Sequence, residues 1–291
     1  MPEENYPIES TLQMLWSDLI EPVLGALGYM EPPVCRGDLP HITWCLTGAL
    51  SFLPVHAAGD YTKQGCSLFD YAISSFTPSV SALLAPLGSP EEYSGILAIG
   101  QAHTPGLAPL PGTVTELEKI IAQADTASLT RLEGAQATTE ATLAALDSRS
   151  WVHFACHASQ NVASPTESAF HLHNGSLDLA TIARKQLKHA DLAFLSACQT
   201  ATGDADLPQE AVHLAAGMIV AGYRRVIATL WSINDEDAPL VAEKFYAYML
   251  DKEIANEGKA AKALHHAVGC LRDKVGVRSF ERWAPYIHIG Q

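Results

Sequence analysis

The chain has 291 residues, of which 48% are hydrophobic and 17% charged, so it can bury a sizeable core and is not disordered as a whole. Its 32 acidic and 18 basic side chains give a formal net charge of −14 at pH 7. A surface this negative repels phosphate backbones and anionic lipids. Composition therefore argues against nucleic acid or a membrane as a partner, and favours basic peptide segments.

The sequence contains no apolar run near the roughly 18 residues that a membrane-spanning helix needs. The first twenty residues are acidic and lack the basic and then apolar order of a signal peptide. The 6 cysteines form no CxxC pair and have no zinc-finger spacing. Without a secretory signal they are typical of reduced thiols, so we expect a cytoplasmic or nuclear protein.

The predicted elements begin with an amphipathic helix over residues 10–27, which ends near Gly28 and contains Pro22, a residue that kinks helices. Strands are predicted at 41–46, 96–100, 151–157, 169–173, 192–197 and 226–231. Helices are predicted from Thr113, which forms a capping box with Glu116, and at 139–147, 179–188, 208–222, 238–250 and 257–274.

The alternation of these strands and helices predicts a three-layer α/β/α fold with a mostly parallel central sheet. The runs at 192–197 and 226–231 are apolar on both faces, as expected for parallel strands that helices cover on each side. Residues 1–90 are less regular and richer in Gly, Pro and Ser. We interpret them as an accessory part that extends the same sheet, and residues 91–291 as the main part.

Two buried strands end in residues suited to nucleophilic catalysis. His157 closes the run WVHFACH, and Cys198 follows the run LAFLSA. Parallel neighbouring strands would bring both residues to one edge of the sheet, where ligands bind in such folds. An imidazole close to a thiol can remove its proton, and backbone N–H groups at the following turn can face a developing oxyanion.

The other cysteines and histidines have simpler interpretations. Strand alternation directs Cys156 away from the side of His157, so we expect it to be a core residue. His153 and His157 lie four positions apart, which on a strand separates them by roughly 13 Å and excludes joint binding of one metal ion. The pairs His171–His173 and His265–His266 give little support for a metal site, and we predict none.

A third strand end is followed by the acidic run Asn234-Asp235-Glu236-Asp237. These residues suit the N-cap and first turn of the 238–250 helix, where acidic side chains favour the helix dipole. They equally suit a pocket for a cationic side chain beside the nucleophile, and both interpretations can hold together. Within the pocket interpretation, Asp235 is the direct partner and Asp237 the better cap.

The set WVHFACHA, LAFLSACQTATG, EAVHLAAGMIVAGYRRVIATLWSINDEDA and WAPYIHIG resembles the CHAT domain, which belongs to the clan of caspases, metacaspases and separase. The resemblance covers nearly the whole chain. It implies a caspase-like fold with a pseudo-caspase-like N-terminal part over 1–90, a catalytic part over 91–291, His157 as general base and Cys198 as nucleophile. The separase branch has a similar LW-x-x-x-D-x-D segment, which implies that Asp235 and Asp237 bind the basic side chain before the cleaved bond.

The resemblance further implies a cysteine endopeptidase that needs no cofactor and prefers Arg before the scissile bond. The backbone N–H groups of Cys198 and Ala158 would form the oxyanion hole. Family relatives commonly have Gly where this chain has Ala158, which restricts φ at that position. Family members often carry tetratricopeptide repeats, and none precede the domain here, so such a region or another regulatory partner is an expected companion.

The alternative from another class is a catalytically inactive caspase-like module that serves as an interaction or regulatory domain, because fold does not guarantee activity. Retention of both His157 and Cys198 favours the enzyme. An α/β hydrolase or nucleotide enzyme is less compatible with the sequence, which has no GxSxG elbow, no GxGxxG after the first strand and no GxxxxGK[ST] loop.

Overall fold

The computed structural model describes residues 7–30, 39–84, 93–159, 161, 164–196, 198–199, 211–254 and 258–290, without the side chains of 7, 165, 198–199 and 211–213. Within this part, the strands are β1 (His41–Trp44), β2 (Ile73–Phe76), β3 (Ile96–Gly100), β4 (Leu129–Glu133), β5 (Trp151–Ala155), β6 (His157–Ser159), β7 (Ala169–Leu172), β8 (Gly175–Asp178), β9 (Leu192–Leu195), β10 (Cys198–Gln199), β11 (Arg225–Thr229) and β12 (Tyr286–Gly290).

The helices of the same part are α1 (Pro7–Leu15), α2 (Glu21–Leu27), α3 (Leu68–Tyr71), α4 (Val80–Leu84), α5 (Gly112–Gln123), α6 (Thr139–Leu146), α7 (Leu179–Arg184), α8 (Ala211–Val220), α9 (Ala238–Leu250), α10 (Lys259–Val275) and α11 (Phe280–Trp283). The predicted 10–27 helix occurs as α1 and α2 joined by a π-helical turn over Trp16–Ile20. Pro22 is the second residue of α2, and Gly28 follows the end of α2 with a left-handed φ of 74°.

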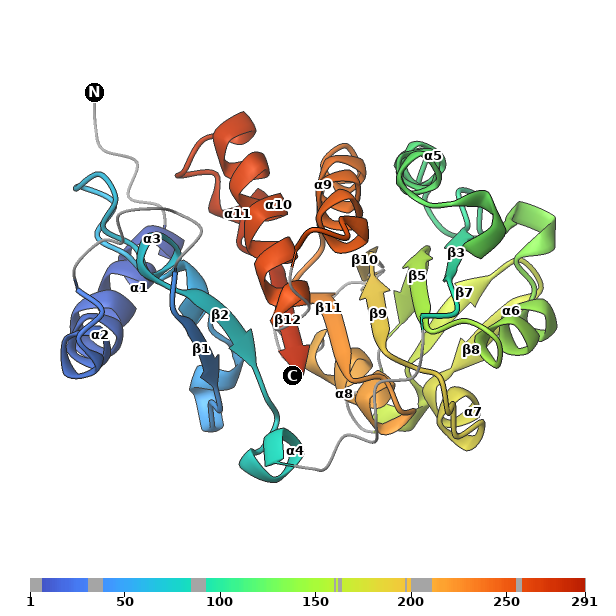
Figure 1. Cartoon of the computed structure of the whole chain (residues 1–291), viewed down its shortest axis with the longest axis horizontal. Helices are drawn as coiled ribbons and strands as arrows, with labels where there is room; N and C mark the ends of the chain where they lie inside the picture. The colour runs from blue at the N-terminus through green and yellow to red at the C-terminus, as the bar shows by residue number, and fades with distance from the viewer. Residues whose placement is uncertain are drawn as a thin grey trace.

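The described strands form an eight-stranded sheet in the order β1-β2-β12-β11-β9-β5-β3-β4, which crosses the molecule in Figure 1. Neighbours are parallel except for β11 and β12, so the predicted mostly parallel sheet is confirmed. β1 and β2, from the N-terminal part, extend this sheet beyond β12. The sequence patterns missed β2, β4, β8 and β12, which are short or carry polar and charged residues that weaken the apolar signal.

A second, four-stranded sheet has the order β10-β6-β7-β8. It explains why the predicted strands at 151–157 and 192–197 are each interrupted. The first breaks at Cys156 into β5 and β6, and the second ends at Leu195 before β10. The large sheet therefore delivers two neighbouring strands, β5 and β9, to the edge where the small sheet begins.

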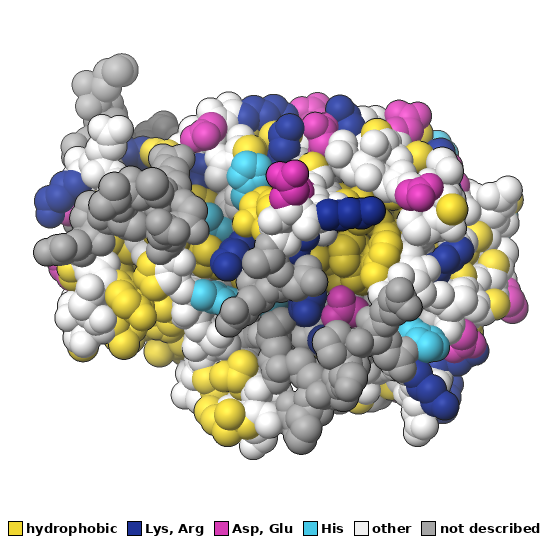
Figure 2. Space-filling model, viewed as in Figure 1, with side chains coloured by type: hydrophobic (Ala, Val, Ile, Leu, Met, Phe, Trp, Pro, Cys, Tyr) yellow, Lys and Arg dark blue, Asp and Glu magenta, His cyan; other side chains and the backbone are white. Residues whose placement is uncertain are grey.

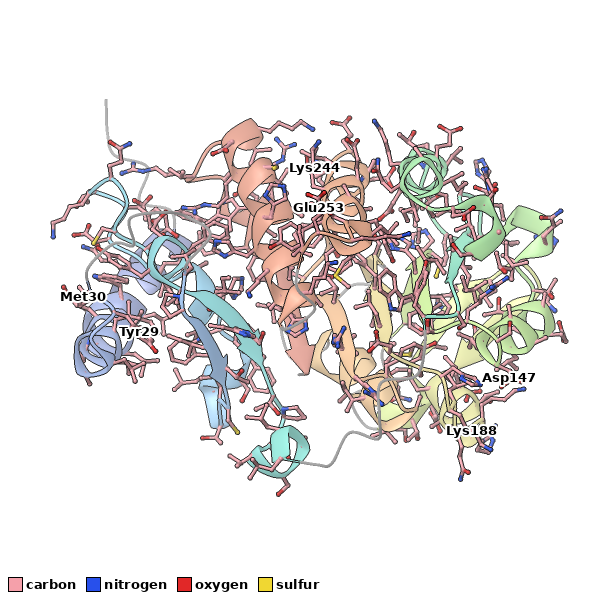
Figure 3. The ribbon with its side chains drawn as sticks, in the orientation of Figure 1. Tyr29, Met30, Asp147, Lys188, Lys244 and Glu253 are labelled. Carbon is pink, nitrogen blue, oxygen red and sulfur yellow. The ribbon has the colours of Figure 1, made fainter. Side chains whose placement is uncertain are left out.

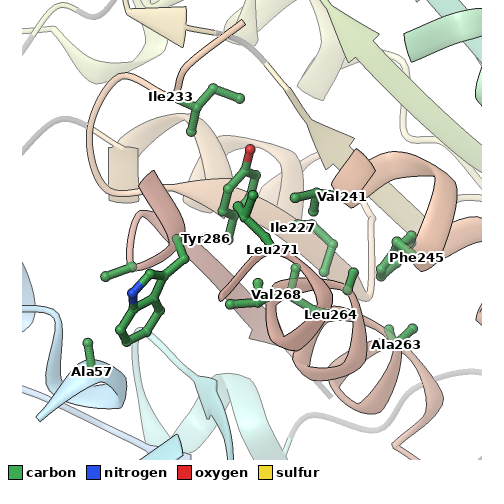
Figure 4. Packing of buried hydrophobic residues seen from close by; sticks show 14 of the residues in the cluster. Ala57, Ile227, Ile233, Val241, Phe245, Ala263, Leu264, Val268, Leu271 and Tyr286 are labelled. Carbon is green, nitrogen blue, oxygen red and sulfur yellow. The ribbon is translucent and has the colours of Figure 1, made fainter. Parts of the chain in front are cut away.

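Helices cover both faces of the large sheet. On one face α5, α9 and α10 lie next to one another, as Figure 1 shows. Their side chains share a buried cluster with Ile227 and Phe194, part of which is drawn in Figure 4. On the other face α6, α7 and α8 pack against Val226, Ala193 and Val152. Alternate residues of each strand thus enter different cores, which is the arrangement expected of an α/β/α fold.

The surface carries charges of both signs. In Figure 2, Lys and Arg side chains and Asp and Glu side chains are both scattered over the visible face. Exposed residues such as Asp147, Lys188 and Glu253 lie on the outside of the molecule (Figure 3). In the described part of the chain, no helix is both long and apolar enough to cross a bilayer.

Candidate active site

The backbones of the two predicted catalytic residues lie side by side. β6 and β10 pair in parallel, with Cys198 and His157 as direct Cα partners and Gln199 opposite Ala158. Neighbouring strands lie about 4.8 Å apart in the hydrogen-bonding direction. The side chain of Cys198 and the residues 200–210 that follow it lie outside the described part. What the structure establishes is the register, which is the juxtaposition that a cysteine–histidine pair requires.

His157 is held by one of its two ring nitrogens. Its side chain is buried, and Nε2 lies 2.7 Å from the carbonyl oxygen of Ala108. A carbonyl can only accept, so Nε2 carries the proton and donates it. Nδ1 is buried and has no hydrogen-bond partner among the described residues. The imidazole therefore has a fixed tautomer, with a lone pair on Nδ1 that is able to take a proton.

The carbonyl that holds His157 belongs to the segment between β3 and α5. This segment is fastened at its start, where the N–H of Gln101 donates to Ala155 at 2.9 Å, and it closes on itself through Leu110 N–H to Ala102 O, also 2.9 Å. The sequence analysis did not identify Ala108. Its contribution is a backbone carbonyl, which every residue type possesses, so no sequence pattern could have marked it.

Asp235 meets the same segment four residues further on. Its Oδ2 accepts a hydrogen bond of 2.6 Å from the backbone N–H of Gly112, the first residue of α5. The carboxylate is half-buried, and Oδ1 has no hydrogen bond within the described residues. A negative charge at this helix N-terminus is favoured by the helix dipole. Asp235 thus caps α5, and not the helix that follows it in sequence.

Asp237 lies in an internal ion pair. It is fully buried, and its two carboxylate oxygens each accept a 2.6 Å hydrogen bond from Arg282. Lys274 approaches Oδ1 at 3.6 Å. Asp237 occupies the N-cap position of α9 as expected, but its side chain makes no capping hydrogen bond. The structure gives this carboxylate partners within the chain, which leaves it poorly suited to bind a substrate.

The predicted capping box at the start of α5 is wrong. Thr113 donates its hydroxyl to Leu110 O at 2.8 Å, and Glu116 turns inward. Glu116 is 1% exposed, and its Oε1 lies 3.1 Å from Nε2 of His153, which is fully buried in β5. Tyr246 lies 3.3 Å from the other ring nitrogen of His153. Burial, reinforced by the Glu116 charge, raises the pKa of Tyr246 well above its usual value.

Cys156 and Ala158 lie on the other side of the sheet from Glu116 and Tyr246. Both are fully buried in the cluster on the α6, α7 and α8 side of the sheet, as alternation along the strand predicts for Cys156. Ala158 lies in β6 and has no left-handed φ, because among the described residues other than glycine only Gln186 has a positive φ. An alanine is therefore accommodated at this position without backbone strain.

No group of three or more His, Cys, Asp or Glu residues that could hold a metal ion occurs in the described part of the chain. His171 is the Cα partner of His157 across β6 and β7, and its Nδ1 pairs with Ser176 at 3.0 Å. Burial, followed by the repulsion of His157, lowers the pKa of His171. These contacts give a cysteine–histidine pair, one orienting carbonyl and one acidic residue attached to the same segment.

Comparison with known proteins places this arrangement in a family. The family profile described as the CHAT domain matches residues 9–291. No curated protein sequence matches the chain. Among solved structures, the complex of the pro- and mature domains of RgpB from Porphyromonas gingivalis superposes with a TM-score of 0.56 at 10% identity, over 98% of this chain and 74% of that one.

Two further structures share the fold. The Arg-specific cysteine proteinase gingipain R has a TM-score of 0.54 at 10% identity, covering 98% of this chain and 73% of its own. The separase–securin complex of Saccharomyces cerevisiae has a TM-score of 0.55 at 16% identity, over 86% of this chain and only 15% of that one. The chain belongs to the CHAT domain family, and its fold is that of the caspase-like cysteine peptidases.

Proposed function

We propose that the protein is a cysteine endopeptidase with a dyad of Cys198 and His157. The observation that carries this proposal is the register of β6 and β10, which makes the two residues Cα partners. The hydrogen bond from His157 Nε2 to Ala108 O further supports the proposal, because it favours the tautomer with the proton on Nε2 and the lone pair on Nδ1. The reaction needs this lone pair. A base of this kind converts the thiol into the nucleophilic thiolate.

In this mechanism Nδ1 of His157 takes the proton of the Cys198 thiol, and the sulfur attacks the peptide carbonyl. The resulting oxyanion is held by the backbone N–H groups of Cys198 and Ala158. His157 then gives the proton from Nδ1 to the leaving amine, and a thioester remains. Water, deprotonated by His157, hydrolyses the thioester and restores the thiol. Ala108 holds the ring throughout and acts as a positioning group.

The substrate class is a protein or peptide segment with a basic residue, preferably Arg, before the scissile bond. Asp235 supports this proposal because its carboxylate is half-buried and keeps one oxygen that no described residue engages. It is attached to the segment that holds His157, so it lies on the same structural unit as the base. One of the solved structures with this fold is described as an Arg-specific proteinase.

Charge selects among substrates at such a site. A guanidinium donates two hydrogen bonds in a fork, whereas Lys offers a point charge, so Arg is expected to be preferred over Lys. Asp is rejected by repulsion between like charges. The net charge of −14 attracts basic segments over a longer range, and this contribution fades as salt is added.

The test is a matched set of peptides that differ only in the residue before the scissile bond, assayed on the wild type, Asp235→Ala and Asp237→Ala. We expect cleavage after Arg, a weaker reaction after Lys, and a loss of this preference in Asp235→Ala. Asp237→Ala keeps the preference in whatever fraction of the protein remains folded. A preference for Asp or for a bulky apolar residue would contradict the basic pocket, and no cleavage of any peptide would favour the inactive interaction module.

A further inference from the structure

The segment 101–112, here named the tether loop, holds both polar groups of the proposed site. Ala108 O accepts from His157 Nε2, and Gly112 N–H donates to Asp235 Oδ2. The two attachment points are four positions apart in the chain, a length that spans at most about 14 Å even when fully extended. The base lies in β6 and the acidic residue in the segment between β11 and α9, so the tether loop is a direct connection between them.

The loop is bonded so that its two attachment points move together. Leu110 lies between them, its N–H donating to Ala102 O and its carbonyl accepting from the Thr113 hydroxyl at 2.8 Å. At the other end, the side-chain amide of Gln101 donates to His103 O at 2.7 Å. Gln101 and Thr113 are 1% and 3% exposed, so both bonds are shielded from water. A displacement at Gly112 is therefore transmitted to Ala108.

Gly112 shows how closely Asp235 is fitted to the loop. A Cβ at this position would lie 2.2 Å from the carbonyl oxygen of Asp235 and 2.6 Å from its Cγ. Only glycine permits this approach. A side chain that merely capped α5 could do so from a greater distance. The close packing joins the backbone of Asp235, as well as its carboxylate, to the loop.

The first turn of α5, which follows the tether loop, is also held by a buried contact. Glu116, one turn along α5 from Gly112, lies against His153 of β5, the strand that leads into β6 and His157. The start of α5 is thereby anchored to the strand that carries the base.

We propose that the tether loop is a positioning element that couples Asp235 to the alignment of His157. Binding of a guanidinium group at Asp235 then fixes the orientation of the His157 ring. This inference rests on the proposed function. A guanidinium binds Oδ1 of Asp235, which no described residue engages, while Oδ2 keeps the hydrogen bond from Gly112 N–H. The carboxylate is thereby fixed, and the loop passes this restraint to the Ala108 carbonyl. A basic substrate then raises kcat in addition to lowering KM, because part of its binding energy is used to align the base.

Three variants separate this coupling from simple helix capping. Asp235→Ala removes both the charge and the acceptor of Gly112 N–H. Asp235→Asn removes the charge but keeps an oxygen that can accept from Gly112. Asp178→Ala is the matched control, because Asp178 caps α7 with a hydrogen bond of the same length, 2.6 Å, and its loss removes the cap of a different helix.

The first readout is the imidazole nitrogen NMR spectrum of the full chain, with the signals of His157 assigned by their loss in His157→Gln. We expect Asp235→Ala to shift the His157 signals and to lower the population of the tautomer that is protonated at Nε2. Asp235→Asn and Asp178→Ala leave these signals as in the wild type. Unchanged His157 signals in Asp235→Ala would overturn the coupling. The contact between Asp235 and Gly112 would then be only a cap of α5. This measurement requires no turnover, so it stands even where the peptidase proposal fails.

The second readout is kinetic and uses a peptide with citrulline in place of Arg, which keeps the shape of the side chain without its charge. In the wild type we expect Arg to exceed citrulline in kcat as well as in kcat/KM. For the citrulline peptide, kcat falls about tenfold further in Asp235→Ala than in Asp235→Asn, which corresponds to the loss of one neutral hydrogen bond. Equal kcat in the two variants would contradict the coupling.

Discussion

The interior of the large sheet and its edge surround the same residue types with different neighbouring groups. His153 and His157 are four positions apart, and both are buried. In the interior, His153 has Glu116 beside one nitrogen and Tyr246 beside the other. At the edge, His157 has Ala108 O on one side and a lone pair on the other. Neither His157 Nδ1 nor His153 Nε2 makes a hydrogen bond among the described residues, but the Glu116 carboxylate lies against the latter. Nδ1 of His157 is therefore the nitrogen suited to chemistry.

The two aspartates after β11 repeat this contrast. Asp237 places both oxygens on Arg282 and is fully buried, whereas Asp235 gives one oxygen to Gly112. Residue type alone does not distinguish the members of either pair. The distinction comes from which charged or hydrogen-bonding groups the surrounding chain places against each side chain. Substitutions at these residues test the contrast.

The largest effect is expected from the two histidines. His157→Ala should lower kcat/KM at least about a hundredfold, the lower range for loss of a general acid or base, with the fold retained. His153→Ala should leave the folded fraction active. Peptide cleavage normalised to folded protein measures both. An active His157→Ala variant beside a folded but inactive His153→Ala variant would reverse the assignment.

Removal of His153 should appear in stability. His153→Ala leaves the Glu116 carboxyl group buried beside an empty space, and loss of one partner of a buried pair costs about 3–5 kcal/mol of unfolding free energy. Urea denaturation measures this change. The double variant His153→Leu with Glu116→Leu should recover much of the loss, because replacing both partners by apolar groups avoids an unpaired buried charge. No recovery would show that packing, and not charge, dominates.

A second pair of buried histidines predicts loss of stability in acid. Burial lowers the pKa of His56 to about 4 and that of His288 to about 3. The unfolded value is about 6.5, so the unfolded chain binds more protons between these limits. Above about pH 6.5 these two histidines do not lower the free energy of unfolding. Towards pH 4 each of them lowers it by about 1.4 kcal/mol per pH unit. Unfolding free energies at pH 7 and 5 test this, and His56→Gln should reduce the difference.

Asp237→Ala should cost about 1–3 kcal/mol of stability, because it removes a buried carboxylate with two charged hydrogen bonds and leaves Arg282 without them. Thermal unfolding measures the loss. The variant should keep its preference for Arg substrates. A stable Asp237→Ala protein that had lost this preference would move substrate recognition from Asp235 to Asp237.

The smallest effect is expected at Ala158. Its backbone needs no positive φ, so Ala158→Gly relieves no strain and should not raise activity. Glycine within a strand lowers stability by roughly 0.5–1 kcal/mol relative to alanine. A clear gain in kcat for Ala158→Gly would show that the methyl group restricts the oxyanion hole.

Much of the fold could be predicted from local patterns, because long apolar runs such as 192–197 and strong helix periodicities such as 238–250 suit only a few structures. The break at Cys156 could not, since residues on both sides are apolar and the change of strand partner is decided by distant parts of the chain. The pairing of His157 with Cys198 followed from two strand ends. The roles of Ala108, Gly112 and Arg282 depend on contacts across many positions, which sequence spacing does not express.

The central claim, that Cys198 and His157 form a working peptidase dyad, is tested most directly by cleavage of a diverse peptide library read by mass spectrometry. The wild type should cut peptides predominantly after Arg. Cys198→Ala should cut none, since Cys156 faces the opposite core, while Cys156→Ala should retain the wild-type cleavage pattern. An unreactive wild type, or cleavage that persists in Cys198→Ala, would contradict the account.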